Sequence, residues 1–348
     1  MTVLSVARGR GVFGSARRAK LERILSEERQ KRKQWRGILR AVSTSETEAI
    51  VTSSLSLGRT GIVVASLLAL VAAQGLLHGQ TPASAPAAPK RTTVLRLWDF
   101  DCGQIHSKDQ SRWTPNLHVG QAVDLSDNCY LIQHPTRGLF LWDTGMADSV
   151  VAKPTGQEQG GGMIFARAKT FVSQLAAAGF TPNMVENMAF SHSHPDHTGN
   201  ALLFPQAMLY IQQTEFDAAF APNAQGNPPG ASPYSERLRS SLVRKINGDF
   251  DVFGDGSITI ISTPGHTPGH QSLLVRLPKR GNVILTGDSA HFKENWDLDH
   301  VPGFNFNQEQ SHQSMAKLKA LAEKEHAEVW INHEKQISDK IPKGVPIE

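Results

Sequence analysis

Short apolar runs alternate with polar and glycine-rich segments through residues 93–348. Runs of strand length, rich in β-branched and aromatic residues, predict strands at 94–98, 129–132, 138–142, 185–190, 209–211, 258–261, 283–285 and 329–331. A helix is expected over 166–178, and Met315, Leu318 and Leu321 mark one face of another. Because strands and helices are mixed throughout, the pattern predicts an α/β fold.

The N-terminal part of the chain has a different pattern. Residues 61–73 form an apolar run of 13 residues after Arg59. This run is short for a membrane span and typical of a signal-peptide core; the alternative is an uncleaved inner-membrane anchor over residues 61–77. A signal core this deep in the chain also predicts a native start nearer residue 51, with Val51 as an alternative initiator.

These patterns divide the chain into three parts. Residues 1–50 are a basic extension, expected to be disordered or non-native. Residues 51–90 contain the signal peptide or anchor and a linker rich in proline and alanine. Residues 91–348 are expected to form the folded domain, exported to the periplasm or secreted. Membrane contact is expected only through an uncleaved N-terminal segment.

Formal charge follows the same division. Residues 1–90 contain 14 basic and 5 acidic residues, a charge of +9, so the rest of a chain with net charge +4 carries −5. A mildly acidic folded domain does not favour a nucleic-acid partner, since phosphate binding needs a basic face.

The chain has two cysteines, Cys102 and Cys129. Two thiols cannot form a thiolate zinc cluster or a dense disulfide framework. In an exported protein they could form one disulfide, and the alternative is two buried thiols packed as small apolar side chains.

A dense group of metal-ligand residues follows the strand predicted over 185–190. His192 and His194 alternate along the chain and so share one face of an extended backbone. Pro195 then turns the chain and directs Asp196 and His197 towards a second ion. Three more such residues, each after a strand-like run, complete a set of five histidines and two aspartates: His266, Asp288 and His333. That set is too large for one tetrahedral zinc and suits two metals sharing Asp288.

The segment 192–197 resembles the His-x-His-x-Asp-His motif of the metallo-β-lactamase superfamily. Segments 263–270, 286–288 and 332–333 match the remaining ligand segments of that family in order. The resemblance covers residues 93–337 and implies a four-layer αβ/βα sandwich. Within the superfamily, 266–273 and 293–295 resemble the N-acyl-homoserine lactonases.

The resemblance also implies roles for these residues. One zinc ion is bound by His192, His194 and His266, and the other by Asp196, His197 and His333. Asp288 bridges the two ions together with a hydroxide, which attacks the lactone carbonyl in a quorum-quenching ring opening. Asp196 relays the proton to the departing alkoxide, and Asp143 orients a ligand histidine.

One position departs from the lactonase pattern. Lactonases of this group often have a tyrosine three residues after the bridging aspartate, and this chain has His291 there. An imidazole N–H can donate the same hydrogen bond to the substrate carbonyl, with a different reach and pH dependence. The departure weakens the substrate assignment and leaves the hydrolytic centre intact.

Several alternatives stay open at this point. The substrate could instead be a β-lactam, a glutathione thioester or an organophosphate, and a metal-dependent binding or sensor protein is a further reading. Manganese, iron or cobalt could replace zinc, and His270 could exchange roles with His266. Five apolar residues are expected either to line an acyl-chain pocket or to complete the core: Met146, Met163, Ile164, Phe165 and Phe304. The glycine run 160–162 is assigned only flexibility, and a homodimer is one expected assembly.

Overall fold

The computed structural model describes residues 94–348 except 223–226, 228–229 and 241. Its strands form two mixed sheets. The first has the order β4 (Gln157–Gln159), β5 (Met163–Ala166), β1 (Arg96–Ser107), β2 (Val123–His134), β3 (Gly138–Trp142), β6 (Val185–Ala189), β7 (Met208–Gln212) and β8 (Val243–Ile246). The second has the order β13 (Glu328–Trp330), β12 (Gly281–Leu285), β11 (Gln271–Leu277), β10 (Ile258–Ser262) and β9 (Phe250–Asp251).

The two sheets pack face to face because alternate residues of each strand point to opposite sides. On β3, Phe140 and Trp142 belong to the core shared with β10, β11 and β12, whereas Leu139 and Leu141 belong to a separate core. Leu273 and Val275 of β11 pack into the shared core from the second sheet. The space between the sheets is therefore filled by side chains from both.

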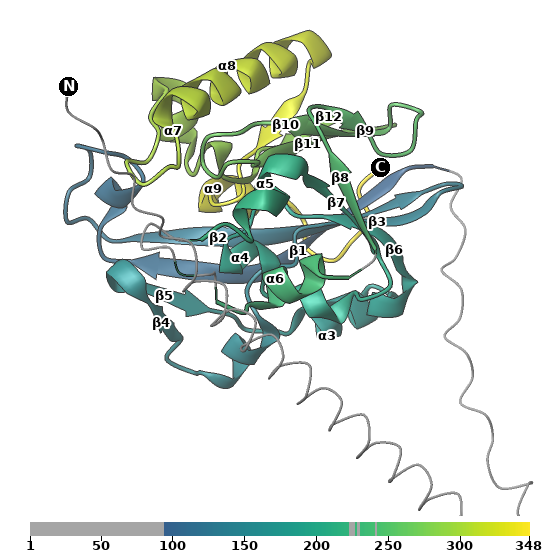
Figure 1. Cartoon of the computed structure of the whole chain (residues 1–348), viewed down its shortest axis with the longest axis horizontal. Coiled ribbons are helices and arrows are strands. Elements are labelled where there is room, and N and C mark those ends of the chain that lie inside the picture. The colour runs from purple at the N-terminus through teal and green to yellow at the C-terminus, as the bar shows by residue number, and fades with distance from the viewer. Residues whose placement is uncertain (1–93, 223–226, 228–229, 241) are drawn as a thin grey trace, which may run out of the picture. The chain divides into compact units, whose positions relative to one another are not determined.

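Helices cover the outer faces of both sheets (Figure 1). Phe171 and Leu175 of α3 pack on the first sheet, and Leu318 of α8 packs against Ile284 on the second. The described helices are α3 (Phe171–Ala177), α4 (Pro195–Thr198), α5 (Gln213–Ala218), α6 (Pro233–Leu238), α7 (Lys293–Leu298), α8 (Gln308–Glu325) and α9 (Lys335–Ser338). This arrangement is the predicted four-layer αβ/βα sandwich.

The predicted helix over 166–178 begins too early and is wrong at its start. Residues 163–166 are β5, which pairs with β1, and Thr170 caps α3 by accepting a hydrogen bond from the backbone of Ser173 at 3.1 Å. Strand pairing with a neighbour distant in sequence overrode the local helical pattern.

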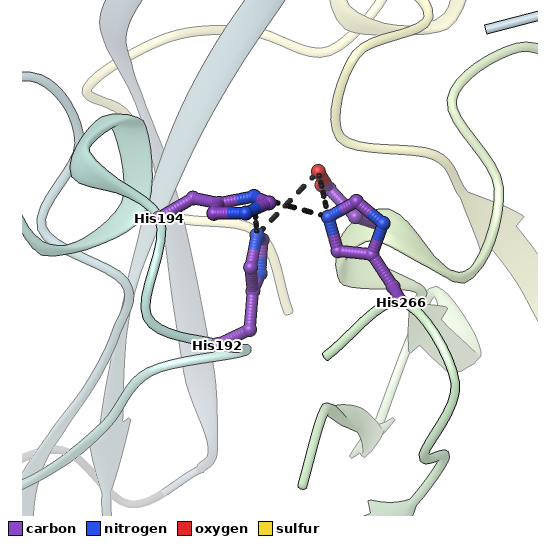
Figure 2. Close-up of side chains that lie close together, drawn as sticks. His192, His194 and His266 are labelled. Atoms are coloured by element: carbon purple, nitrogen blue, oxygen red, sulfur yellow. Dashed lines mark hydrogen bonds and ion pairs between the residues drawn. The ribbon is translucent and has the colours of Figure 1, made fainter. Parts of the chain in front are cut away.

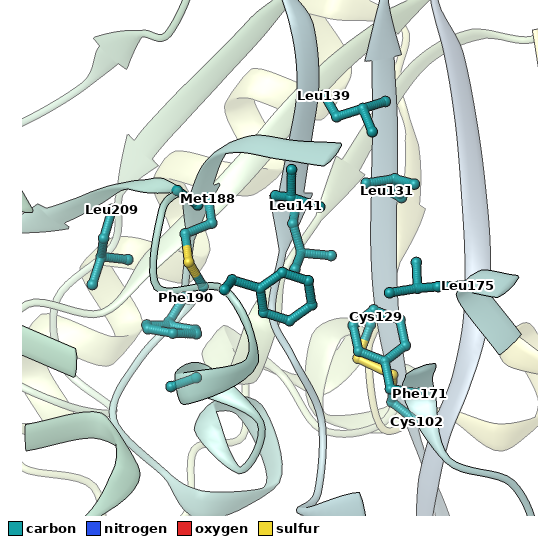
Figure 3. Packing of buried hydrophobic residues seen from close by; sticks show 14 of the residues in the cluster. Cys102, Cys129, Leu131, Leu139, Leu141, Phe171, Leu175, Met188, Phe190 and Leu209 are labelled. Atoms are coloured by element: carbon teal, nitrogen blue, oxygen red, sulfur yellow. A yellow bond between two sulfur atoms is a disulfide. The ribbon is translucent and has the colours of Figure 1, made fainter. Parts of the chain in front are cut away.

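Cys102 and Cys129 form a disulfide between β1 and β2, so the alternative of two free thiols is wrong. The bond packs against Phe171 and Leu175 (Figure 3). A disulfide of this kind indicates an oxidising compartment. The expected basic extension, signal core, linker and Val51 start lie outside the described residues. Within the described part of the chain, no helix has the length and apolar character needed to cross a membrane.

Candidate metal centre

The first group of predicted ligands lies where β6 ends and α4 begins. Pro195 occupies the first turn of α4 and His194 is its N-cap residue, a position where the missing N–H of proline costs nothing. The extended residues before the helix bring His192 Nε2 to 2.8 Å from His194 Nδ1. His266, from the loop between β10 and β11, places its Nε2 3.1 Å from the same His194 nitrogen. Figure 2 shows the three imidazoles turned towards one another.

Asp288 lies between this group and a second one. It belongs to the short 3-10 turn Gly287–Ser289 that follows β12, and it is 3% exposed. Its Oδ2 lies 3.6 Å from His192 Nε2 and 3.3 Å from His266 Nε2. Its Oδ1 lies 3.2 Å from His197 Nε2 and 3.1 Å from His333 Nε2. Each carboxylate oxygen therefore faces a different group of imidazoles.

The second group consists of Asp196, His197 and His333. One potential ligand atom from each lies within 4.8 Å of the others. Asp196 Oδ2 is 3.9 Å from His197 Nε2 and 3.8 Å from His333 Nε2. The structure thus brings together all seven residues predicted as ligands. We call this set (His192, His194, Asp196, His197, His266, Asp288 and His333) the metal cluster.

The chemistry of the metal cluster fits two divalent cations. His197 Nε2 and Asp288 Oδ1 are buried and lack hydrogen-bond partners among the described residues, although burial without a partner is costly for such groups. Imidazole nitrogens that face one another, as those of His192 and His194 do, suit a shared cation. With nitrogen and carboxylate donors and no thiolate, the residues could hold two ions on either side of Asp288.

The electrostatics of the two groups differ. Burial lowers the pKa of His192 well below its usual value and that of His194 to about 4, so both imidazoles are neutral and able to ligate. Burial also opposes protonation of His333, but the neighbouring Asp288 carboxylate outweighs it and raises the pKa of His333 to about 9. The pKa of Asp288 is held well below its usual value despite burial, because several imidazoles surround it.

Outer contacts orient the imidazoles. Asp143 places Oδ2 3.0 Å from His197 Nδ1, and its Oδ1 accepts the backbone N–H of Ser191 at 2.6 Å, as expected of an orienting residue. His333 donates from Nδ1 to the Ser126 carbonyl at 2.7 Å. These hydrogen bonds leave each Nε2 free to point into the metal cluster.

His270 lies behind the metal cluster. Its Nε2 accepts the backbone N–H of Asp288 at 2.9 Å, and its Nδ1 lies 2.9 Å from Thr263 Oγ1. Both ring nitrogens are therefore occupied. His266, with Nε2 facing Asp288, is the member of the pair that joins the metal cluster, so the geometry gives no support to an exchange of roles.

Glu215 was missed by sequence reasoning. This residue of α5 is 2% exposed, and its two oxygens accept backbone N–H groups from Ser193 at 3.0 Å and Gly269 at 2.8 Å. It therefore joins the loop that carries His192 and His194 to the loop that carries His266. A lone acidic residue in a short helix gives no signal of such a role in a single sequence.

A cavity of about 310 Å³ opens above the metal cluster. Its lower part is formed by members of that cluster and by His291, whose Nε2 is 3.1 Å from Asp288 Oδ2. Apolar side chains line the wall: Ile105, Trp113, Met163, Phe165 and Phe304. Of the residues expected to form an acyl pocket, Met163, Phe165 and Phe304 line the cavity, whereas Met146 is buried in the core beneath it. Ile164 does not line the cavity.

The outer edge of the cavity is formed by Arg112, Gln159, Gly160 and Phe304, which we call the pocket rim. Arg112 and Gly160 are exposed, and Phe304 is 44% exposed. The cavity therefore has a buried polar base and a solvent-facing rim of mixed character.

A paired-sheet sandwich with this His and Asp cluster at its edge defines a known class. Residues 123–325 match the family model of the metallo-beta-lactamase superfamily, and the chain belongs to that superfamily. It is a metal-dependent hydrolase of this class, and its buried clusters are consistent with a binuclear site.

More specific similarities are to lactonases. The chain is 35% identical over 251 residues to N-acyl homoserine lactonase AttM of Azorhizobium caulinodans, covering 70% of this chain and 94% of the relative. It is 31% identical over 255 residues to an N-acyl homoserine lactonase of a Bacillus species, with the same coverage. A solved N-acyl homoserine lactone hydrolase, with N-hexanoyl-L-homoserine at its catalytic metal centre, superposes with a TM-score of 0.62 at 28% identity. That match covers 74% of this chain and 100% of the other.

Proposed function

We propose that this protein hydrolyses the lactone ring of N-acyl-homoserine lactones. The observation that carries the proposal is Asp288, whose two oxygens face two separate His and Asp groups at the base of an apolar-walled cavity. An amphiphilic substrate with an ester at one end and an acyl chain at the other suits a polar base and an apolar wall. The AttM and Bacillus relatives are N-acyl homoserine lactonases, which supports the same substrate class.

In this proposal two zinc ions occupy the metal cluster. His192, His194 and His266 would hold one ion, Asp196, His197 and His333 would hold the other, and Asp288 would contact both. Two bound cations supply Lewis acidity and lower the pKa of water enough for hydrolysis near neutral pH. Manganese, iron or cobalt would be accepted by the same donors, so the metal present in cells depends on availability.

The protein's own groups position the substrate and move the proton. Asp196 lines the cavity, and its side chain is 11% exposed, so it can take a proton from the attacking water and pass it to the alkoxide that leaves when the ring C–O bond breaks. His291 also lines the cavity, and its Nε2 lies 3.1 Å from Asp288 Oδ2 at the base. Its imidazole donates an N–H to the lactone carbonyl.

We also propose that the enzyme acts outside the cytoplasm. The disulfide between Cys102 and Cys129 supports an oxidising compartment, and the apolar run 61–73 is of signal-peptide length. N-terminal sequencing of the mature native protein tests the signal peptide, and a native protein that retains residues 1–50 would contradict a start near residue 51.

The activity is tested with the zinc-loaded full-length chain and a substrate panel. We expect the lactone ring of N-hexanoyl-homoserine lactone to open, giving an acid heavier by one water. A thioester, a β-lactam and a phosphotriester should give much lower kcat/KM. A protein with two bound ions that prefers another member of the panel would reassign the substrate. Inactivity towards the whole panel would favour a binding or sensor protein.

A further inference from the structure

Arg112 stands out because it is a cation at the pocket rim. It ends the 3-10 turn Gln110–Arg112, is exposed, and lines the cavity. No carboxylate pairs with it among the described residues, whereas other arginines such as Arg276 and Arg280 do form ion pairs. The mechanism described above leaves Arg112 unused.

Aromatic rings hold the guanidinium in place. The Arg112 guanidinium carbon lies 5.3 Å from the Phe304 ring centre and 5.9 Å from the Trp113 ring centre. The Phe304 ring also lies near the imidazoles of His266 at 5.9 Å and His291 at 6.2 Å. Arg112 is therefore separated from the base of the cavity by the breadth of one aromatic side chain.

The glycine run 160–162 gives Arg112 its space. A Cβ placed on Gly161 would lie 2.1 Å from the nearer guanidinium nitrogen of Arg112, whereas a Cβ on Gly162 would meet no atom within 4 Å. Both residues have a positive φ, 74° and 77°, so they differ in what lies beside them and not in backbone conformation. The glycine at 161 thus allows the backbone to approach the guanidinium.

From this arrangement we infer that Arg112 selects acyl-homoserine lactones that carry a carbonyl oxygen on the third carbon of the acyl chain. The inference rests on the proposed lactonase function and names its substrate more closely. A 3-oxoacyl amide presents two carbonyl oxygens on alternate carbons, which the planar fork of a guanidinium can bind with two N–H groups. The third acyl carbon is five bonds from the lactone carbonyl carbon, about 6 Å in an extended chain. That reach matches the 5.9 Å between the His266 and Phe304 ring centres, so the oxygen comes level with the ring over which Arg112 lies.

The test compares N-octanoyl- and N-(3-oxooctanoyl)-homoserine lactone, which have the same chain length, on the zinc-loaded full-length protein. We expect the wild type to show a KM at least about tenfold lower for the 3-oxo substrate, because only that substrate accepts two hydrogen bonds from the charged guanidinium. Arg112→Gln should reduce this ratio to less than about threefold by raising KM for the 3-oxo substrate alone. Arg112→Lys keeps the charge without the fork and should fall between the two.

Two matched pairs serve as controls. Gly161→Ala should displace the guanidinium and lower the 3-oxo preference, while Gly162→Ala, at the same backbone conformation, should keep it. Arg239 stacks on Phe220 at 4.9 Å outside the cavity, and Arg239→Gln should have no effect.

The outcomes separate this inference from the proposed function. If the wild type opens both lactones with equal KM, or if Arg112→Gln keeps the wild-type ratio, Arg112 does not select the 3-oxo group and the lactonase proposal stands. If Gly162→Ala lowers the preference as much as Gly161→Ala, loop strain and not displacement of Arg112 is responsible, and the role of Gly161 is refuted. If the wild type opens neither lactone, the proposed function fails and this inference fails with it.

Discussion

The metal cluster and the pocket rim are built on opposite principles. The side chains of the metal cluster are held at strand ends and by outer hydrogen bonds such as that from His197 to Asp143, and all of them except the partly buried His194 are buried. The rim consists of the exposed Arg112, Gly160 and Phe304 and the partly buried Gln159, and Arg112 lies over two aromatic rings with no ion pair among the described residues. A rigid buried cluster can fix the reaction, while an exposed rim can change its chemistry without disturbing the fold. We therefore expect changes in the cluster to alter metal binding and turnover, and changes in the rim to alter substrate choice.

The largest expected effect is that of Asp288→Asn. An amide at this position cannot balance two cations, so we expect loss of bound metal and a fall in turnover of at least about 10³-fold, beyond the 10–100-fold typical of outer-contact residues. Metal analysis and lactone turnover on the same samples measure both. Asp297→Asn, at an exposed site on α7, is the control. Undiminished hydrolysis by Asp288→Asn would remove its bridging role.

Chelation of the metals should abolish turnover reversibly. Adding zinc back also tests whether the metal cluster and the pocket rim are energetically independent. A ligand that binds only the folded state at 100 times its Kd stabilises it by about 2.7 kcal/mol, so zinc should raise the unfolding temperature of the metal-free protein by several degrees. Arg112→Gln should show the wild-type rise and Asp288→Asn little or none. A reduced rise in the Arg112 variant would show that the rim and the metal cluster are energetically coupled.

Glu215→Gln tests the support of the metal cluster. The amide nitrogen would oppose one of the two backbone N–H groups, from Ser193 or Gly269, that the carboxylate now accepts. We expect zinc affinity to fall by about 10–100-fold, measured by competition with a chromophoric chelator. The exposed Glu236→Gln on α6 is the matched control. Unchanged zinc affinity together with a lower unfolding temperature of the metal-free protein would make Glu215 a fold-stabilising residue and no more.

The same contrast explains what could be predicted from the sequence. His192, His194 and Asp288 were found because metal chemistry demands particular residue types directly after strands, and that demand leaves a local pattern. Strands with continuous apolar runs, such as 138–142, were found for a similar reason. Glu215 was missed because its partners are backbone groups from two distant loops.

Arg112 and Gly161 show a different limit of sequence reasoning. The glycine run could be read from the sequence. The need for glycine at 161 comes from Arg112, about fifty positions earlier, which the fold places beside it. The helix expected from residue 166 began too early for a related reason, since pairing of β5 with β1 joins residues far apart in the chain. Contacts that depend on tertiary structure leave no periodic pattern to read.

The smallest expected effect is that of Phe304→Ala at the rim. Loss of one half-exposed ring from the wall removes about 1 kcal/mol of apolar contact with a long acyl chain, which corresponds to a KM increase of about fivefold with kcat within about twofold. The increase should be larger for a decanoyl substrate than for a butanoyl one, because the longer chain makes more apolar contact with the ring. Phe306, 65% exposed and absent from the cavity lining, provides the matched Phe306→Ala control. A fall in kcat that is equal for both chain lengths would mean that Phe304 acts by supporting His266 or His291, and the separation of rim from metal cluster would then fail at this residue.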